Sequence, residues 1–480
     1  MHCPGAATPR RPRHIEDSTG PQAPEGAHAL PFASINPSSG ELIVEFAPTT
    51  ERALNAILER ADLAFRGDWG RAHCAVRGNM LRAAADSLRE NRMTLARTAT
   101  LEMGKRLTEA LFEIEAAAGL FEVHADSIAD ERLGDIAGHG PSPGLCDAAP
   151  VGVVLCVETW NFPFFELARV AAPNLAAGNT VIARHSSRLP LCAAAFERVV
   201  RAAGLPMGAF STVFLTDDLL ERALLDTRVH GVSMHGTHRR VAACAMAAGK
   251  ALQLMSHEPA GTDVFAVLDD ADVGLAVDLA VEGRLANCGQ MCSGARRFLV
   301  TPPIARAFTE QLAAAMAARI PAEPGSAATL LGPVASRAGL EHSLDLMGKA
   351  MRAGAQLLTG GRRVDRPGFY LEPAVLAMGA DDPAFSEDFL GPVAMVATIG
   401  GDDDVVRIAN RKPGGLGGSI VSQDTDRALR VARQFAHGRV YINETALSRK
   451  ARLGTHGPQG AALSQLPVRA FVHRRTIHMP

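Results

Sequence analysis

The segment 287–292, with the sequence NCGQMC, carries the strongest chemical signal in the chain. It follows a helix-like run and precedes the strand-like run 296–300. A cysteine between two regular elements lies near backbone N–H groups, where a thiol can act as a nucleophile and an oxyanion can be stabilised. The alternative is that Cys292 is a small core residue, as many unpaired cysteines are. Cys292 is the candidate nucleophile.

Two distant segments add an amide and a carboxylate. Asn161 follows the strand-like run 151–157, and Glu258 lies at the junction between two βα series. A carboxylate at such a junction can be partly desolvated and act as a general base. The alternatives are that Asn161 only turns the chain before Pro163 and that Glu258 is a solvated loop residue. No second histidine follows His257 at zinc-binding spacing, so we predict no metal site.

The elements that must position these residues alternate between strand and helix from residue 151 onward. Helical patterns cover 73–100 and 107–131, and the glycine- and proline-rich segment 132–150 is either a loop or an excursion from the main body. From 151 to about 437 apolar runs of strand length alternate with amphipathic helical runs. This alternation predicts an α/β fold with parallel sheets covered by helices. No G-x-G-x-x-G fingerprint lies between a strand and a helix, so a dinucleotide would bind without the usual glycine loop.

Composition excludes several classes of function. The 480 residues are 47% hydrophobic and carry a formal net charge of −2, so we expect no nucleic-acid partner. No apolar run is long enough to span a membrane, and no membrane partner is expected. The eight cysteines have no paired spacing, which is typical of reduced thiols in a cytoplasmic protein. Cys288 lies four residues before Cys292, and a reversible disulfide between them is a hypothesis.

The motifs, in this order, resemble the aldehyde dehydrogenase superfamily. The marks are WNFP at 160–163, the glutamate motif at 258–261 and GQMC at 289–292, supported by INPSSGE at 35–41, LEMGK at 101–105 and GPV at 391–393. The separation of Glu258 and Cys292 matches that of the family's base and nucleophile. Within the superfamily the chain is most similar to bacterial NAD(P)-dependent succinate-semialdehyde dehydrogenases.

The resemblance implies two Rossmann-like parallel-sheet βα domains plus a small oligomerisation excursion, and a homodimer or homotetramer. The expected domains are a disordered leader at 1–33, a dinucleotide-binding domain at 34–125 and 148–257, a catalytic domain at 258–445, and oligomerisation elements at 126–147 and 446–480.

It also implies a reaction in which Cys292 attacks a small aldehyde, with succinate semialdehyde as the candidate substrate. The Asn161 side-chain amide and the Cys292 backbone N–H stabilise the oxyanion, and hydride transfer to the nicotinamide leaves a thioester. Glu258 activates the water that releases the acid. Arg169 matches a position that binds the substrate carboxylate in succinate-semialdehyde enzymes, or it is a helix-surface arginine.

The cofactor expected from the resemblance is NADP, with NAD possible. The family's usual ribose-binding glutamate is replaced by Ser187, which removes a charge that would repel a 2′-phosphate, and Arg184 and Arg188 add positive charge. The expected cofactor-binding residues are Trp160, Arg184, Ser187, Gly236, Thr237 and Asp388.

Four departures from the family pattern keep a second hypothesis open. Pro259 follows the glutamate, Val241 replaces a glycine that would approach the pyrophosphate, Asp388 replaces a glutamate, and the C-terminal motif is unrecognisable in 452–464. The first hypothesis is an active NAD(P)-dependent aldehyde dehydrogenase. The alternative is a protein of the same fold with impaired turnover that acts as a binding or partner subunit.

Overall fold

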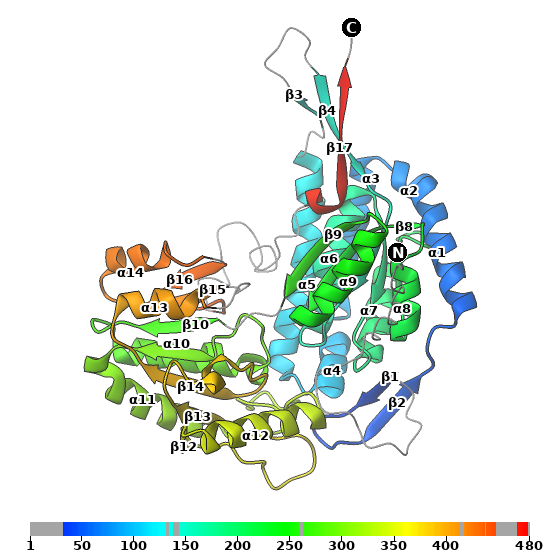
Figure 1. The fold of residues 1–480 in the computed structure, drawn as a ribbon. Coiled ribbons are helices and arrows are strands. Elements are labelled where there is room, and N and C mark those ends of the chain that lie inside the picture. The colour runs from blue at the N-terminus through cyan, green and yellow to red at the C-terminus, as the bar shows by residue number, and fades with distance from the viewer. Residues whose placement is uncertain are drawn as a thin grey trace, which may run out of the picture.

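The computed structural model describes residues 32–130, 134–137, 144–259, 263–411, 417–436, 438–447 and 468–478. Two lobes, each built on a mainly parallel sheet, lie side by side, and a narrow three-stranded sheet projects from one of them (Figure 1). Among the described residues, no helix combines the length and apolar character needed to cross a membrane.

A five-stranded parallel sheet forms the first lobe. Its order is β7 (Phe210–Val213), β6 (Thr180–Arg184), β5 (Val153–Val157), β8 (Val229–Gly236) and β9 (Leu254–Pro259). Every residue of β5 and β6 is buried. These strands are continuous apolar runs because helices cover both faces of the sheet.

Helices pack on the two faces of this sheet in two separate cores. One core contains side chains of α3 (Cys74–Glu90), α4 (Arg92–Met103), α5 (Leu107–Asp130), α6 (Pro163–Ala177) and α7 (Pro190–Ala202). The other contains side chains of α1 (Glu51–Arg66), α8 (Asp217–Leu224) and α9 (His238–Lys250). The helical pattern predicted over 73–100 is divided at Asn91 into α3 and α4. Asn91 is the C-cap of α3, and its side-chain Nδ2 donates a hydrogen bond to the Ser87 carbonyl.

The second lobe has a seven-stranded sheet. Its order is β12 (Gln356–Thr359), β13 (Ala374–Ala377), β14 (Val393–Thr398), β11 (Arg297–Val300), β10 (Val264–Val267), β15 (Gly417–Val421) and β16 (Arg439–Ile442), and β12 is antiparallel to its neighbour. Its core includes side chains of α10 (Val273–Leu285), α11 (Pro302–Ala317), α12 (Arg337–Arg352), α13 (Asp402–Ala409) and α14 (Thr425–Ala432). The α/β fold predicted from the sequence is confirmed.

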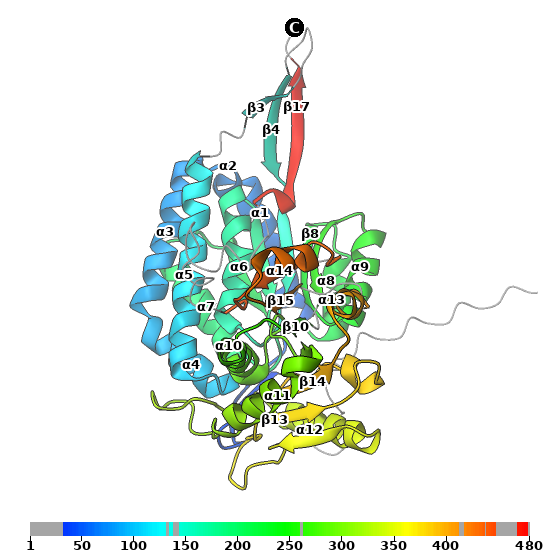
Figure 2. The same ribbon diagram turned by 90° about the vertical axis from the view of Figure 1, so that its left-hand side faces the viewer.

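The smaller elements connect and extend the lobes. β1 (Phe32–Ile35) and β2 (Leu42–Phe46) form a hairpin, and α2 (Asp68–Arg71), η1 (Ala286–Gly289), η2 (Pro383–Ser386) and η3 (Val468–Phe471) are single turns. The segment 132–150 supplies β3 (Gly134–Ala137) and β4 (Gly144–Pro150), and β4 pairs antiparallel with the C-terminal β17 (Val472–His478). Figure 2 shows this sheet standing away from both lobes.

The domain boundaries stay a prediction. The expected leader falls mostly on residues 1–31, and much of the expected C-terminal oligomerisation element falls on 448–467. Both ranges lie outside the described residues.

Candidate active site

The ends of neighbouring parallel strands bring ionisable side chains together. Arg184 ends β6, Glu158 follows β5, His235 lies near the end of β8 and Glu258 near the end of β9. The register of β8 and β9 places His235 opposite Glu258. Because the carboxyl ends of parallel strands meet at one edge of the sheet, this edge is where a ligand site is expected in an α/β fold.

The loop that carries Cys292 has an unusual backbone. Asn287, Cys288 and Gly289 all have positive φ values, of 50°, 55° and 72°. Only glycine adopts this region routinely, so two consecutive non-glycine residues there indicate a conformation imposed by the surrounding structure. A Cβ atom at Gly289 would collide with the Gly391 carbonyl, which makes glycine necessary at this crossing.

Two buried arginines hold this loop through backbone carbonyls. The Arg284 guanidinium donates to the carbonyls of Gly294 and Ala295 at 3.3 and 3.2 Å and also to that of Gly289. Arg296 donates to the carbonyl of Met291 at 2.8 Å and to that of Cys292 at 3.3 Å. Burial lowers the pKa of Arg284 to about 9. These two buried arginines therefore fix the position of the cysteine loop by binding its backbone carbonyls.

Asn161 contacts the same loop. Its side-chain Nδ2 donates to the Gln290 carbonyl at 3.1 Å, and its own carbonyl accepts from Asn287 Nδ2 at 2.8 Å. Its Oδ1 accepts from Thr159 at 2.7 Å, which fixes the orientation of the amide. The start of α6 behind Asn161 is anchored by Glu113, which accepts from two backbone N–H groups there. The structure thus brings Asn161 to the cysteine loop.

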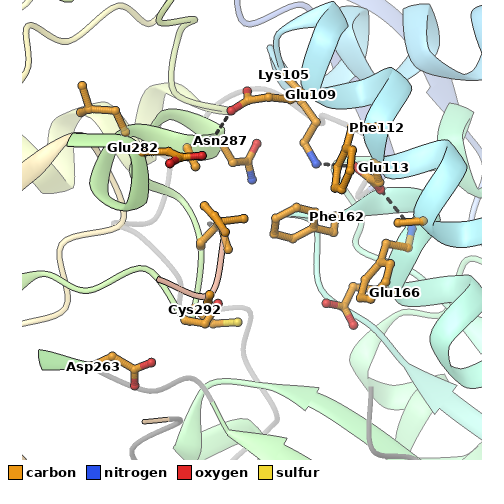
Figure 3. Close-up of a pocket in the computed structure, with 18 of the residues that line it drawn as sticks. Lys105, Glu109, Phe112, Glu113, Phe162, Glu166, Asp263, Glu282, Asn287 and Cys292 are labelled. Atoms are coloured by element: carbon orange, nitrogen blue, oxygen red, sulfur yellow. Dashed lines mark hydrogen bonds and ion pairs between the residues drawn. The ribbon is translucent and has the colours of Figure 1, made fainter. Parts of the chain in front are cut away.

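Two cavities meet at Cys292. The larger, of about 1160 Å³, is lined by residues of both lobes, including Cys292, Glu258 and Arg169. The smaller, of about 230 Å³, is bordered by Cys292, Asn161 and the ends of β5, β6 and β8. Figure 3 shows the Cys292 sulfur directed across the larger cavity toward the side on which Glu166 lies. One thiol therefore faces a space on each side.

A buried ion-pair cluster lies beside the larger cavity. Arg169 donates to Glu166 at 2.7 Å and to Glu258 at 2.9 Å, and its guanidinium is 3.5 Å from Glu158 and 3.2 Å from His235 Nδ1. Arg169 is buried, whereas the Glu258 side chain is about one third exposed, at 33%. The carboxylate expected to be a base is therefore held by the arginine expected to bind substrate.

The carboxyl groups of the cluster differ in ionisation. Burial raises the pKa of Glu158 to about 8, against the opposing effect of Arg169. Burial also acts against ionisation of Glu166, but Arg169 and His235 outweigh it and lower the pKa of that group. Glu158, Glu166 and His235 lie close enough to share a metal ion, but Arg169 already provides the cation at their centre, so the geometry favours an ion-pair cluster.

The smaller cavity collects the residues predicted to bind a cofactor. It is lined by Trp160, Arg184, Ser187, Gly236 and Thr237. Thr237 occupies the N-cap position of α9 without a capping hydrogen bond from its side chain, and the N–H groups at a helix N-terminus attract anions.

Two further arginines line this cavity: Arg188, which the sequence already offered as a source of positive charge, and Arg240, which was not singled out from the sequence. The Arg188 guanidinium lies 6.0 Å from the centre of the Trp160 ring, and Arg240 is in the first turn of α9. Arg240 and Arg184 both approach Asp217, at 3.6 and 3.7 Å. Among the described residues that line this cavity, three are arginines and one, Glu158, is a carboxylate.

The structure shows where the residues that depart from the family pattern lie. The Val241 side chain packs in the core between α9 and the sheet and does not line the smaller cavity. Asp388 is paired with buried Arg296 at 2.9 Å, and Leu390 is the residue of that segment that lines the smaller cavity. Cys288 is a buried free thiol, 3.3 Å from the Gly332 carbonyl, and Cys292 is also free. Ala260 and Gly261, which complete the glutamate motif, lie outside the described residues.

The sequence interpretation missed Glu158, Glu166 and His235. Each stands within a few residues of a predicted site residue, at a strand end or in the first turn of a helix. That position was the available signal, but their mutual contacts depend on how α6 crosses the sheet.

The chain is similar to one known protein family and to several of its members. The sequence profile of the aldehyde dehydrogenase family matches residues 25–459. A succinate-semialdehyde dehydrogenase (NADP(+)) of Deinococcus radiodurans is 36% identical over 422 residues, covering 87% of this chain and 88% of that protein. A probable enzyme of the same name from Synechocystis is 31% identical over 453 residues, covering 93% and 99%. The crystal structure of succinic semialdehyde dehydrogenase from Streptococcus pyogenes with NADP+ has a TM-score of 0.87 at 30% identity, covering 94% of this chain and 100% of that one.

Proposed function

The chain belongs to the aldehyde dehydrogenase family, and we propose that it oxidises a small aldehyde that carries a carboxylate, of the succinate semialdehyde type, to the corresponding acid with NADP. The observation that carries this proposal is the position of Cys292 on the wall between the two cavities. A nucleophile placed there reaches an aldehyde on one side and the reactive end of a dinucleotide on the other.

The residues around Cys292 supply the steps of the reaction. The thiolate adds to the carbonyl carbon and forms a thiohemiacetal. The oxyanion is stabilised by the Asn161 amide, which has a second hydrogen besides the one donated to Gln290, and by the Cys292 backbone N–H. Once hydride loss has produced the thioester, Glu258 accepts a proton from the water that releases the acid.

The smaller cavity fits a phosphorylated dinucleotide. Trp160, Ser187, Gly236 and Thr237 would hold the cofactor at the strand ends, with the N-terminus of α9 toward a phosphate. Arg184, together with Arg188 and Arg240, favours the 2′-phosphate of NADP over NAD because arginine forms charge-assisted hydrogen bonds with phosphate. Asp388 contributes indirectly, because it is paired with Arg296, which binds the backbone of the cysteine loop. The bound nicotinamide supplies the hydride acceptor.

Arg169 gives the larger cavity a means of recognising a carboxylate. Its guanidinium faces this cavity and is bound to Glu258. We propose that a substrate carboxylate competes with Glu258 for Arg169. A bound substrate carboxylate takes the place of Glu258 on the Arg169 guanidinium. Glu258 is then released to act as the base in the last step.

The test measures NADPH formation by the purified protein with succinate semialdehyde, beside butanal, which has the same carbon chain without the carboxylate. We expect activity with NADP and a kcat/KM that favours the semialdehyde. The Cys292→Ala variant is the control and should be inactive. Absence of NADPH formation together with absence of NADP binding in a calorimetric titration would reject the proposal.

The proposal also covers the oligomeric state and the cellular location. We infer a homodimer or homotetramer because β3, β4 and β17 form a sheet that projects from the body, and we place the enzyme in the cytoplasm because the described cysteines are free thiols. The alternative of a partner subunit with impaired turnover is not favoured, since the relatives matched over most of their length have the names of enzymes.

A further inference from the structure

Two nitrogen atoms of the Arg169 guanidinium are engaged inside the protein, and the third is bound to Glu258 at the larger cavity. Nε donates to Glu166 at 2.7 Å, and Nη2 lies near both His235 and Glu158. Nη1 donates to Glu258, the most exposed carboxylate of the cluster. We propose that Glu166 is a positioning residue that fixes Arg169 with Nη1 toward the cavity and thereby makes the site selective for an aldehyde that carries a carboxylate. This role rests on the proposed function, in which the substrate carboxylate binds Arg169.

Glu166 comes from the same helix as Arg169, one turn earlier. Their i, i+3 spacing places both side chains on one face of α6, and these side chains are 5% and 6% exposed. The first turn of α6 is itself fixed, because Glu113 accepts hydrogen bonds from the backbone N–H groups of Phe164 and Phe165 at 2.7 and 3.0 Å. Glu166 therefore holds the guanidinium from an anchored part of the helix.

The ends of two strands close the inner side of the guanidinium. His235, near the end of β8, has its Nδ1 3.2 Å from Arg169 Nη2 and 3.0 Å from Oε2 of Glu166. Glu158, after β5, has its Oε2 3.5 Å from Nη2, and neither of its buried carboxyl oxygens has a hydrogen-bond partner among the described residues. A guanidinium that turned away from Glu166 would find Glu158 as another acceptor. Glu166 thus decides between two orientations of the cation.

The ionisation of the two buried carboxyl groups favours the observed orientation. Burial acts against ionisation of Glu166, but Arg169 and His235 outweigh it and lower its pKa. Burial raises the pKa of Glu158 to about 8, so at neutral pH Glu158 is the weaker competitor for the cation. Hydrogen bonds between two charged groups are shorter and stronger than neutral ones, in agreement with the 2.7 Å contact of Glu166.

A guanidinium that is already fixed recognises a carboxylate at a low entropic cost, because it need not be ordered when the ligand arrives. The substrate carboxylate approaches Nη1 and takes the place of Glu258 there. An aldehyde without a carboxylate makes no such contact. Loss of the fixed orientation should therefore weaken recognition of a semialdehyde and leave that of butanal unchanged.

The test compares Glu166→Asp, which keeps the charge and shortens the reach, with Glu166→Gln, which loses the charge and keeps an acceptor at the same distance. The measurement is the ratio of kcat/KM for succinate semialdehyde to kcat/KM for butanal, with NADP. Glu166→Asp should lower this ratio about tenfold, the effect of one hydrogen bond to a charged group, and Glu166→Gln by less than about threefold. Glu115→Asp, which changes an exposed glutamate of α5, is the matched control and should keep the wild-type ratio. General damage to the fold lowers both kcat/KM values together and leaves their ratio unchanged.

A second measurement does not depend on turnover. In a calorimetric titration of the protein without cofactor, the wild type should bind succinate, Glu166→Asp should bind it about tenfold more weakly, and Glu166→Gln should stay within about threefold of the wild type. If Glu166→Asp does not fold, as judged by its melting temperature, Glu166→Met takes its place, since it differs from Glu166→Gln mainly in lacking the acceptor. An unchanged Glu166→Asp, equal losses in Glu166→Gln and the variant compared with it, or absence of succinate binding by the wild type overturns the positioning role.

These measurements distinguish the positioning role from the proposed function. The expected succinate affinities without NADPH formation support the role of Glu166 and reject the function. NADPH formation with a preference for the semialdehyde that is unchanged in Glu166→Asp supports the function and rejects the role of Glu166.

Discussion

The two lobes hold their halves of the site by different interactions. On the five-stranded sheet, Arg169 is surrounded by carboxylates, so side-chain charges stabilise one another. On the seven-stranded sheet, Arg284 and Arg296 bind backbone carbonyls of the cysteine loop. The first half depends on protonation and can respond to pH or to a charged ligand. The second depends on shape and serves to fix the sulfur.

The largest effect is expected where the charged half loses its cation. Arg169→Ala leaves buried carboxylates without a partner, and removal of one member of a buried ion pair costs about 3–5 kcal/mol in the free energy of unfolding. Chemical denaturation measures this loss. Arg306→Ala is the control, because Arg306 belongs to an exposed pair with Glu310 and should cost almost nothing. Equal losses in the two variants would contradict the difference between the halves.

The pH response of the charged half is tested with Glu158→Gln, which resembles the protonated acid. Burial raises the pKa of Glu158 from 4.5 to about 8, so the folded state keeps a proton that the unfolded chain releases. Wild-type stability should therefore fall as pH rises from 4.5 to about 8 and change no further through this group above that. The variant should lose roughly 2–4 kcal/mol less over that interval. Thermal melting at pH 5 and pH 8 gives the comparison, and parallel curves would refute it.

The shape-dependent half is tested with Gly289→Ala. The positive φ and the collision with the Gly391 carbonyl should cost about 1–3 kcal/mol and displace Cys292, lowering kcat at every pH. Gly249→Ala, in α9 where a Cβ would meet nothing within 4 Å, is the matched control and should be neutral or slightly stabilising. A pH-dependent loss in Gly289→Ala would erase the distinction between the two halves.

The smallest effect concerns the cofactor side. Arg240→Ala should raise the KM for NADP about tenfold, equivalent to one lost charged hydrogen bond, and leave the KM for NAD unchanged. Steady-state kinetics with both cofactors provide the measurement, and Arg239→Ala in the same turn is the control. An equal change for NAD and NADP would show that Arg240 does not read the 2′-phosphate.

The sequence predicted the parts of the site that follow from local pattern. Asn161 after β5 and Cys292 before β11 stand where apolar strand runs border polar residues, and the structure joins them through Gln290. The position of Val241 in a motif does not tell which face of α9 it occupies. In the structure that face is the core.

The charged cluster could not be predicted in the same way. His235 and Glu166 are far apart in the chain, and their 3.0 Å contact exists only because the first turn of α6 lies near the end of β8. The helix break at Asn91 has a similar cause, since packing and a local cap outweigh a continuous amphipathic pattern. Long-range packing decides such contacts, and no spacing in one chain records it.

The placement of Cys292 on a wall shared by two openings has a kinetic consequence. In the proposed assignment the dinucleotide and the aldehyde occupy different cavities on either side of Cys292, so neither must leave for the other to bind. The acid would then depart through the larger cavity while the dinucleotide stays in the smaller one. The order of product release is then set by the affinity of each cavity for its own ligand.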